Sequence, residues 1–495
     1  MKHPPIWPVI PLLVLSGALV SLGGSTPHRL EDQFDAWVEF TDKGIRTDAA
    51  REAVFLDLER SFDPRAINRR KLRRTREGLF DEYDLPLHAP YLKGVSATGA
   101  DVRVESRWLN GVTVLATREQ LVAIETLPYV REVTDIHPNI PRGAGRGRVP
   151  SDPDLRPTAE PPSGDVYGWS GPQIRQLNIH LLHEAGFTGS GIRIGVIDTG
   201  FLLNHPALDT AGDPIKIAAQ WDFVDNDSVA SPESDDPLDQ HEHGTLILGI
   251  LAANRHREMI GSAPDAEFIL LKAEDGETEY FLEEKWFAAA LEYAERNGAD
   301  VVTSSLVLYQ GYDSSDVNGR TSIMAQAWNL AVGNGVIGLQ GGGNSGHDDD
   351  PSTHHLLPPA GAPGVITVGA VDSEGEIAFF SSDGLRVEGT EKPELLAWGD
   401  GTASISPYQA GGYTLSNGTS MATPLLAGGV ACLLQAHPDW SVQQMKDALR
   451  ASGDYYRAHG RPDPLFVQGY GIPDLAKAIE ELPELMDNTG SPGGG

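Results

Sequence analysis

The chain has 495 residues, of which 40% are hydrophobic and 7% aromatic, so it has enough apolar side chains for a large domain and a small one. Its formal charge of -32 is uneven, because residues 28–150 carry 20 basic and 20 acidic side chains whereas residues 151–495 carry 17 and 50. Such an acidic surface argues against nucleic-acid binding, which needs a basic footprint, and favours calcium binding or a saline habitat.

Residues 1–24 have the composition of a secretory signal peptide. A basic Lys2 precedes an apolar stretch over residues 10–22, and small residues follow it. The alternative is a membrane anchor, but Pro11 interrupts the stretch, which is shorter than the ~20 residues that a membrane span needs. We therefore expect a secreted protein, extracellular or periplasmic, without a stable membrane anchor.

Strand-like and helix-like stretches alternate over residues 28–140. We expect strands at residues 36–41, 100–106, 111–117 and 130–136, and helices at 47–60 and 118–127. This βαββαβ order is that of a small ferredoxin-like α+β domain. We interpret the basic stretch at residues 69–76 as a solvated helix face. Residues 141–164 are rich in Gly, Pro, Arg, Asp and Ser, which predicts a linker.

Residues 165–482 have a different pattern, in which short apolar strands are separated by helical segments. We expect strands at residues 192–197, 266–271, 300–303, 335–339 and 365–368, and a helix at 287–296. Strands without polar alternation, joined by helices, indicate an α/β domain whose parallel sheet is buried on both faces. The single cysteine, Cys432, cannot form an intramolecular disulfide and lies in an apolar run, so we interpret it as a buried core thiol. Residues 483–495 are expected to form a flexible tail.

Two motifs in the large domain place an acid and a base. Asp198 follows an apolar strand in Gly-Val-Ile-Asp-Thr-Gly, and ligand crevices form at the carboxyl ends of such strands. Aspartic peptidases also use Asp-Thr-Gly, but they need two such carboxylates, and no second Asp-Thr-Gly occurs here. His243 begins an apolar helical stretch, and an imidazole there suits proton transfer near neutral pH. Its neighbour His241 is the competing candidate, but only His243 precedes the Gly-Thr that allows a tight turn into a helix.

A third and a fourth motif supply a nucleophile and a donor. Ser420, in Asn-Gly-Thr-Ser-Met-Ala-Thr-Pro, precedes a small and apolar run, which predicts a helix N-terminus where free amide groups stabilise negative charge. The plainer interpretation is a serine N-cap. Pro424 is expected in the first turn of that helix, where a missing amide costs little. Asn344 lies in a Gly-rich loop, where its side-chain amide can donate to an oxyanion or simply belong to a turn.

The order Asp198, His243, Asn344, Ser420, each in its own motif, resembles the subtilisin-like serine peptidases, whose chain order of Asp, His and Ser is the same. The resemblance implies that Ser420 attacks the scissile carbonyl, that His243 is the general base and that Asp198 orients His243. It also implies that Asn344 and the Ser420 amide bind the oxyanion. The chemistry then requires no cofactor.

The same resemblance implies substrate-binding residues and an inhibitor. Residues Ser305, Leu306 and Val307 stand where the family has Ser-Leu-Gly along its substrate-binding strand, and Gly342 and Gly343 precede Asn344. Residues 106–112 resemble the inhibitory prosegments of the family. We therefore expect peptide or protein substrates, the chain's own prosegment as an intramolecular inhibitor, and a monomer. The sequence also predicts that the enzyme cuts itself free between about residues 138 and 165, with the segment after residue 136 entering the cleft as an extended strand.

Alternatives remain at this point. A secreted, catalytically inactive subtilisin-like binding protein is disfavoured because all four chemical residues are present. An α/β-hydrolase esterase needs an acid and a histidine after the serine, where only His437 and His459 are available. Structural calcium is allowed by oxygen donors on one loop, although a solvated acidic loop is the better interpretation. Those donors are Asp222, Asp225, Asp227, Asp235, Asp236 and Asp239.

Overall fold

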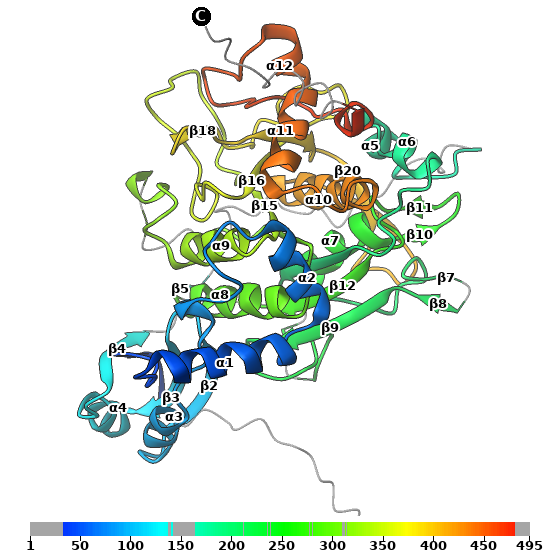
Figure 1. The fold of residues 1–495 in the computed structure, drawn as a ribbon. Coiled ribbons are helices and arrows are strands. Elements are labelled where there is room, and N and C mark those ends of the chain that lie inside the picture. Colours follow the sequence, from blue (N-terminus) through cyan, green and yellow to red (C-terminus); the bar gives the residue numbers. More distant parts are fainter. Residues whose placement is uncertain are drawn as a thin grey trace, which may run out of the picture.

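The computed structural model describes residues 33–136, 140–141 and 164–480, apart from residues 211, 235, 238, 277, 280, 309–311 and 313. The expected signal peptide, nearly all of the expected linker and the expected tail lie outside the described residues. Two domains are visible. The small domain comprises residues 33–136 and the large domain residues 164–480 (Figure 1).

The small domain is an antiparallel sheet with helices on one face. Its strands are β1 (Gln33–Phe40), β2 (Asp101–Ser106), β3 (Gly111–Thr117) and β4 (Val130–Ile136), in the order β2-β3-β1-β4. Its helices are α1 (Asp48–Ser61), α2 (Pro64–Arg73), α3 (Ala89–Ser96) and α4 (Arg118–Glu125), with a 3-10 turn η1 (Glu82–Asp84). Strand residues Ala36, Val38, Val112 and Val114 form a core with α3 and α4.

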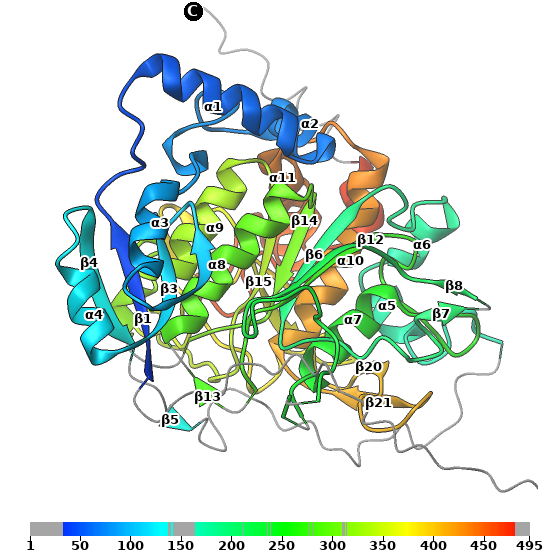
Figure 2. The same cartoon turned by 90° about the horizontal axis from the view of Figure 1, so that it is seen from below.

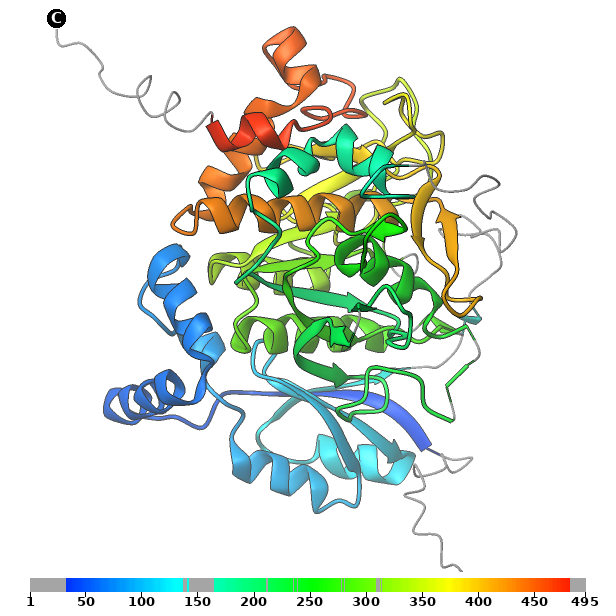
Figure 3. The same ribbon diagram turned by 90° about the vertical axis from the view of Figure 1, so that its right-hand side faces the viewer.

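The helix expected at residues 47–60 is present as α1, but it does not cover the sheet. None of its residues is buried and Leu56 is 57% exposed, whereas Val95 of the unexpected helix α3 is fully buried in the sheet core. Helices α1 and α2 thus form an insertion between β1 and α3. The opposite face of the sheet, with Trp37 and Val104, packs on the large domain (Figure 3).

The large domain has the expected α/β fold. Its seven strands follow the order β19-β16-β15-β14-β6-β12-β9 and all pair in parallel. Their bounds are β6 Arg193–Asp198, β9 Lys216–Asp222, β12 Glu267–Lys272, β14 Val301–Ser304, β15 Ile337–Gly341, β16 Ile366–Val371 and β19 Leu395–Trp398. The two outermost strands, β9 and β19, were not expected from the sequence. Strand β9 begins with exposed residues, and β19 has only four residues.

Helices cover both faces of this sheet (Figure 2). On one face lie α5 (Gly171–Gln176), α6 (Ile179–Glu184), α7 (Glu242–Ala252), α10 (Thr419–Ala436) and α11 (Val442–Ser452), followed by α12 (Asp454–His459). On the other face lie α8 (Phe281–Arg296) and α9 (Ile323–Gly333), which separate the sheet from the small domain.

Apart from the helical residues 475–480, the remaining elements of the described residues are short strands and one 3-10 turn. They are β5 (Ile140–Pro141), β7 (Asp209–Thr210), β8 (Asp213–Pro214), β10 (Asn254–Arg255), β11 (Met259–Ile260), β13 (Thr278–Glu279), η2 (Ser314–Asp316), β17 (Arg386–Val387), β18 (Thr390–Glu391), β20 (Thr402–Ile405) and β21 (Tyr413–Ser416).

Helix α10 is the central helix of the large domain. Within the described residues it alone is long and apolar enough to cross a membrane, but 83% of its most apolar window is buried inside the protein. Cys432 of this helix is fully buried and unpaired, and burial raises the pKa of its thiol. The helix therefore belongs to the core, and Cys432 is part of it.

The basic stretch at residues 69–76 is not a solvated face, as the sequence had suggested. Arg69, Arg70 and Arg73 of α2 are each no more than 5% exposed, because they lie against the large domain. Their hydrogen-bond acceptors in the large domain lie more than two hundred residues away in the chain, so no local sequence pattern reveals them.

Candidate active site

Asp198 and His243 form a hydrogen-bonded pair where β6 ends. Asp198 is the last residue of β6 and its side chain is 1% exposed, whereas His243 is the second residue of α7 and is partly exposed. His243 Nδ1 lies 2.8 Å from Asp198 Oδ1. The Thr199 amide donates to the same oxygen at 2.8 Å and so fixes the carboxylate. The carboxylate can therefore hold the imidazole tautomer that carries its proton on Nδ1, which leaves Nε2 to accept a proton.

Gly244 allows α7 to begin this close to β6. A Cβ atom at position 244 would lie 2.2 Å from the carbonyl oxygen of Gly200 and 3.1 Å from Asp198 Oδ1. The Gly244 amide also donates to Thr199 Oγ1 at 3.2 Å. The glycine after His243 is therefore required by the close approach of two backbones.

His241 has a different environment from His243. Its Nε2 lies 3.4 Å from Asp236 Oδ2, and its ring packs against Gly200, where a Cβ atom would be 2.4 Å from its Cδ2. Burial lowers the pKa of His241 to about 4 although Asp236 opposes the shift. His241 therefore stays neutral near neutral pH, and its ring contacts Asp236 of the acidic loop instead of Asp198.

Ser420 is the second residue of α10, which begins at Thr419 after Gly418. Pro424 is the sixth residue of the helix, so it lies beyond the first turn where the sequence had placed it. A proline there cannot donate to the carbonyl four residues earlier, which is that of Ser420. Ser305 Oγ donates to the Ser420 carbonyl at 3.2 Å instead. The proline thus leaves the Ser420 carbonyl free to accept from Ser305, and this hydrogen bond ties the residue after β14 to the first turn of α10.

Asn344 lies beside Ser420. Its Oδ1 accepts from the Thr419 amide at 2.9 Å and from Thr419 Oγ1 at 3.1 Å, so its orientation is fixed. Gly418 has φ 137°, and a Cβ atom on it would lie 3.5 Å from both Asn344 Nδ2 and the Ser420 amide nitrogen. This small space is bounded by two nitrogen donors and is kept open by the glycine. Such a space suits the oxygen of a tetrahedral intermediate.

The expected substrate-binding residues lie at the same edge of the sheet. Ser305, Leu306 and Val307 follow β14 and are partly buried, and the Leu306 carbonyl accepts from Gln340 Nε2 at 2.9 Å. The amides of the two expected glycines are used within the protein. Gly342 donates to the Val368 carbonyl at 2.9 Å, and Gly343 donates to Thr419 Oγ1 at 3.1 Å. These bonds brace the loop that carries Asn344.

Neighbouring parallel strands bring these residues to one edge. Strands β15, β14 and β6 are adjacent in the sheet, and Asn344, Ser305 and Asp198 follow or end them in that order. Helices α7 and α10 pack against each other, and their first turns carry His243 and Ser420. The structure therefore gathers the acid, the base, the serine and the asparagine at the carboxyl edge, where α/β folds form their sites.

Gln240 is a buried residue that the sequence did not single out. Its Nε2 donates to the Thr199 carbonyl at 2.7 Å and to the Glu274 carbonyl at 2.6 Å, and its Oε1 accepts from the Gly276 amide at 2.7 Å. One side chain thus links the segment after Asp198 to the segment that leads to β13. A glutamine in this position looks in the sequence like any exposed loop residue, so its role could not be predicted.

The acidic loop is organised by a lysine. Lys272, the last residue of β12, is 1% exposed, and its Nζ lies 2.8 Å from Asp222, 3.0 Å from Asp225 and 2.5 Å from Asp236. Burial raises the pKa of Asp222 to about 7 although Lys272 opposes the shift. The ammonium group therefore takes three of the oxygen donors that the sequence offered to calcium. Of the other three, Asp235 lies outside the described residues.

Two groups of side chains have the composition of a cation site. Asp222, Asp227 and Glu233 form one, and Asp348, His355 and Asp383 form the other, with ligand atoms within 4.8 Å of one another in each. Both groups have internal partners, since Lys272 pairs with Asp222 and His355 Nδ1 lies 2.6 Å from Asp383. Structural calcium remains an untested prediction.

The two histidines that an esterase would need lie elsewhere. His437 is the C-cap of α10 and follows Ser420 by 17 residues, a length of roughly 25 Å at about 1.5 Å per residue. Its ring stacks on Trp440, and its Nε2 lies 3.1 Å from the Ile479 carbonyl. His459 ends α12, with Nδ1 2.9 Å from the Tyr455 carbonyl. This geometry does not support the α/β-hydrolase interpretation.

The small domain and the segment that follows it contact the large domain at α8 and at β13. Strand β5 pairs antiparallel with β13, with Ile140 opposite Glu279 and Pro141 opposite Thr278. On α8, the Glu292 carboxylate accepts from Ser106 Oγ and the Trp108 amide at 3.1 Å each and from Arg107 Nε at 2.5 Å. Strand β5, which follows β4 in the chain, is therefore paired with the large domain.

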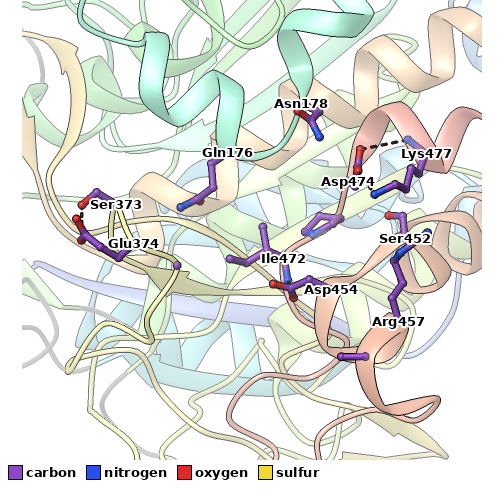
Figure 4. Close-up of a pocket in the computed structure, with 13 residues that line it drawn as sticks. Gln176, Asn178, Ser373, Glu374, Ser452, Asp454, Arg457, Ile472, Asp474 and Lys477 are labelled. Atoms are coloured by element: carbon purple, nitrogen blue, oxygen red, sulfur yellow. Dashed lines mark hydrogen bonds and ion pairs between the residues drawn. The ribbon is translucent and has the colours of Figure 1, made fainter.

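A pocket of about 550 Å³ lies apart from these residues (Figure 4). Its walls come from the end of α5 and the residue before α6, from residues 373–375 after β16, from the end of α11, from α12 and from residues 472–474 and 477. Asp474 and Lys477 form an ion pair of 2.6 Å in it. None of the expected catalytic or substrate-binding residues lines this pocket. We assign it no role in the chemistry.

Two family models match the chain. The model of the subtilase family matches residues 189–471, and the model of the peptidase S8 propeptide domain of Bacteroidota matches residues 35–147. Subtilisin E of Bacillus subtilis is 32% identical over 308 residues, which cover 61% of this chain and 71% of that protein. Subtilisin of Bacillus pumilus is 32% identical over 310 residues, which cover 62% of this chain and 98% of that protein.

A solved structure shares the fold. Fervidolysin from Fervidobacterium pennivorans, a keratinolytic enzyme related to subtilisin, aligns with a TM-score of 0.56 at 20% identity. The alignment covers 90% of this chain and 61% of the length of fervidolysin. At that identity the likeness concerns the fold alone. The family model, however, matches more than half of the chain. The chain therefore belongs to the subtilase family, serine peptidases that hydrolyse peptide bonds, and carries a propeptide domain of that family ahead of its peptidase domain.

Proposed function

We propose that the chain is a secreted serine endopeptidase in which Ser420 is the nucleophile, His243 the general base and Asp198 the residue that orients His243. The observation that carries the proposal is the 2.8 Å contact between His243 Nδ1 and Asp198, at the sheet edge where α10 presents Ser420 beside Asn344. Ser420 attacks the scissile carbonyl while His243 Nε2 takes its proton. The acyl-enzyme forms as His243 returns that proton to the leaving amine, and water then releases the acyl group by the same steps.

Charge that develops on the carbonyl oxygen is stabilised by two donors. Asn344 Nδ2 and the Ser420 amide bound one small space, and the first turn of α10 adds the positive end of a helix dipole. Thr419 supports this arrangement because it bonds both to Asn344 and to the Gly343 amide. Substrate main chain is expected to pair with β13 on one side and with residues 305–307 on the other.

The small domain is proposed to act as an intramolecular inhibitor until it is removed. The pairing of β5 with β13 supports this role, because it lays the segment after β4 along the edge proposed for substrates. The same pairing supports self-cleavage within residues 142–163, beyond Pro141. Secretion is proposed from the composition of residues 1–24 alone, and the active form is proposed to be a monomer.

Active-site labelling tests the proposal. Wild type should react with a fluorophosphonate probe on Ser420 and hydrolyse casein, and Ser420→Ala and His243→Ala should do neither. His437→Ala is the matched control, since His437 caps the far end of α10, and it should keep both reactions. If folded wild type is not labelled, the chain is an inactive member of the family. If His437→Ala abolishes labelling and His243→Ala does not, the assignment of the base is wrong.

A further inference from the structure

The large domain presents a set of acceptors at the sheet edge opposite Ser420. We call it the basal acceptor cluster: the carboxylates of Glu295 and Asp300 and the backbone carbonyl groups of Ala299, Asn334, Pro438 and Trp440. Asp300 and Asn334 precede β14 and β15, so these groups lie at the amino ends of the strands. The side chain of Glu295 has no exposed surface. In the described structure its carboxylate pairs with two arginines, and both belong to the small domain.

Three arginines of α2 fill this cluster. Arg69 donates to the carbonyls of Ala299 at 2.5 Å and Asn334 at 3.3 Å, and also to the Glu295 carboxylate. Arg70 binds both oxygens of Glu295, at 2.7 and 2.8 Å. Arg73 donates to the carbonyls of Trp440 at 2.9 Å and Pro438 at 2.6 Å. Planar guanidinium groups with several donors suit such a set of acceptors, and a lysine offers no comparable fork.

Arg70, the middle arginine of the three, is also held by its own domain. Arg70 also binds Asp84 at 2.7 Å and the Leu79 carbonyl at 3.0 Å, and its guanidinium lies 5.0 Å from the ring centres of Phe62 and Phe80. Because these partners all belong to the small domain, little freedom is lost on docking. Charge favours the same contact, since residues 151–495 carry 50 acidic against 17 basic side chains.

We propose that the basal acceptor cluster is a second docking site for the small domain, and that it keeps the small domain bound after its tail has been cut. The proposal rests on the proposed function, because it describes the inhibitor of that same enzyme. Figure 2 shows α2 and the β5–β13 pair at opposite ends of the molecule. Cleavage beyond Pro141 removes the covalent link but leaves the Glu292 contacts and the three arginines in place. Release then requires separate attachments to open together, which slows it.

The test starts from the full-length Glu295→Gln chain and follows it through self-cleavage. The cut itself should occur at the wild-type rate, because β5 still reaches β13. The two fragments should then separate on gel filtration, and casein hydrolysis should appear at least about a hundredfold sooner than in wild type, since an unpaired buried charge remains. Arg60→Gln is the control, because Arg60 is 77% exposed on α1 and pairs only locally with Asp57. Fragments that stay together in Glu295→Gln with a wild-type delay would overturn the proposal, as would an equal shortening in Arg60→Gln.

A second measurement does not depend on catalysis. In the Ser420→Ala chain, hydrogen exchange of the α2 amides should be slow, and adding Glu295→Gln should make it roughly a hundredfold faster while β1 to β4 keep their protection. Arg65→Ala replaces Glu295→Gln if that variant does not fold, since Arg65 is 32% exposed and reaches Asp300 at the rim. Unchanged exchange in α2 would refute the second docking site even if wild type proved inactive. Absence of processing with faster α2 exchange would instead count against the proposed function alone.

Discussion

Replacing Lys272 by methionine should destabilise the large domain strongly near neutral pH. The ammonium group lies within 3.0 Å of Asp222, Asp225 and Asp236, and both Lys272 and Asp222 are at most 1% exposed. Removing one partner of a buried ion pair costs about 3–5 kcal/mol, because the remaining charge loses its compensation. For a domain of this size we expect the melting temperature to fall by about 10 °C.

The loss should shrink as the solution becomes more acidic. Burial raises the pKa of Asp222 to about 7 even with Lys272 present, which is above its value of 3.8 in an unfolded chain. Because folding raises this pKa, the Asp222 carboxyl group destabilises the native state fully above about pH 7, and the penalty shrinks as the pH falls and is gone below 3.8. Below about pH 7 the native carboxyl group is protonated, so the loss of the ammonium group costs less there. The difference between Lys272→Met and wild type should therefore be large at about pH 8 and small at about pH 5.

Calorimetry of both chains in the Ser420→Ala background avoids self-digestion during heating. Lys477→Met is the matched control, because Lys477 is 49% exposed and pairs only with Asp474 three residues away; it should shift stability by about 0.5 kcal/mol or less. Calcium should raise the melting temperature of Lys272→Met more than that of wild type, since three hard oxygen donors lose their ammonium partner. A Lys272→Met chain that melts like wild type at both pH values would refute this reasoning.

Three further outcomes follow from the geometry. Asn344→Ala should lower kcat roughly 10²- to 10³-fold with little change in KM, measured on a peptide substrate, and an unchanged kcat would remove Asn344 from the oxyanion site. Gln240→Ala should raise KM more than it lowers kcat, because Gln240 holds residues 274–276 ahead of β13; a loss confined to kcat would show that it acts on Asp198 instead. Burial raises the pKa of Glu295, but Arg70 and Arg69 outweigh burial and hold that pKa at about 2, below the usual 4.5. The ionised carboxylate therefore stabilises the docked small domain fully above pH 4.5, and this stabilisation is lost as the pH falls toward 2. Gel filtration should find the processed fragments together at about pH 5 and apart at about pH 3, and Glu295→Gln should lack this dependence.

Local patterns predicted much of the fold. Apolar runs located β6, β12, β14, β15 and β16, because strands buried on both faces lack polar alternation. The edge strand β9 was not predicted because its first residues are exposed, and α3 was not predicted because it has only eight residues. The family resemblance implied that Asp198 orients His243, and the two side chains lie 2.8 Å apart.

Pairings between distant residues could not be predicted. Arg70 and Glu295 are 225 positions apart, so a basic helix that is buried has the same local sequence as one in solvent. Lys272 gave no sign that it would compensate the acidic loop, since its partners lie 36 to 50 residues earlier in the chain. Gln240 likewise shows its role only through carbonyl groups that the fold brings to it.

Self-processing tests the central claim most directly. Wild type and Ser420→Ala should be produced in a protease-deficient host and compared by intact mass and N-terminal sequencing. The account predicts that wild type yields a fragment whose new N-terminus lies within residues 142–163, beyond the β5–β13 pair, and that Ser420→Ala remains one chain across that segment. A Ser420→Ala chain cut at the same bond would assign processing to another enzyme, and a wild-type chain that is active at full length would show that the small domain is not an inhibitor.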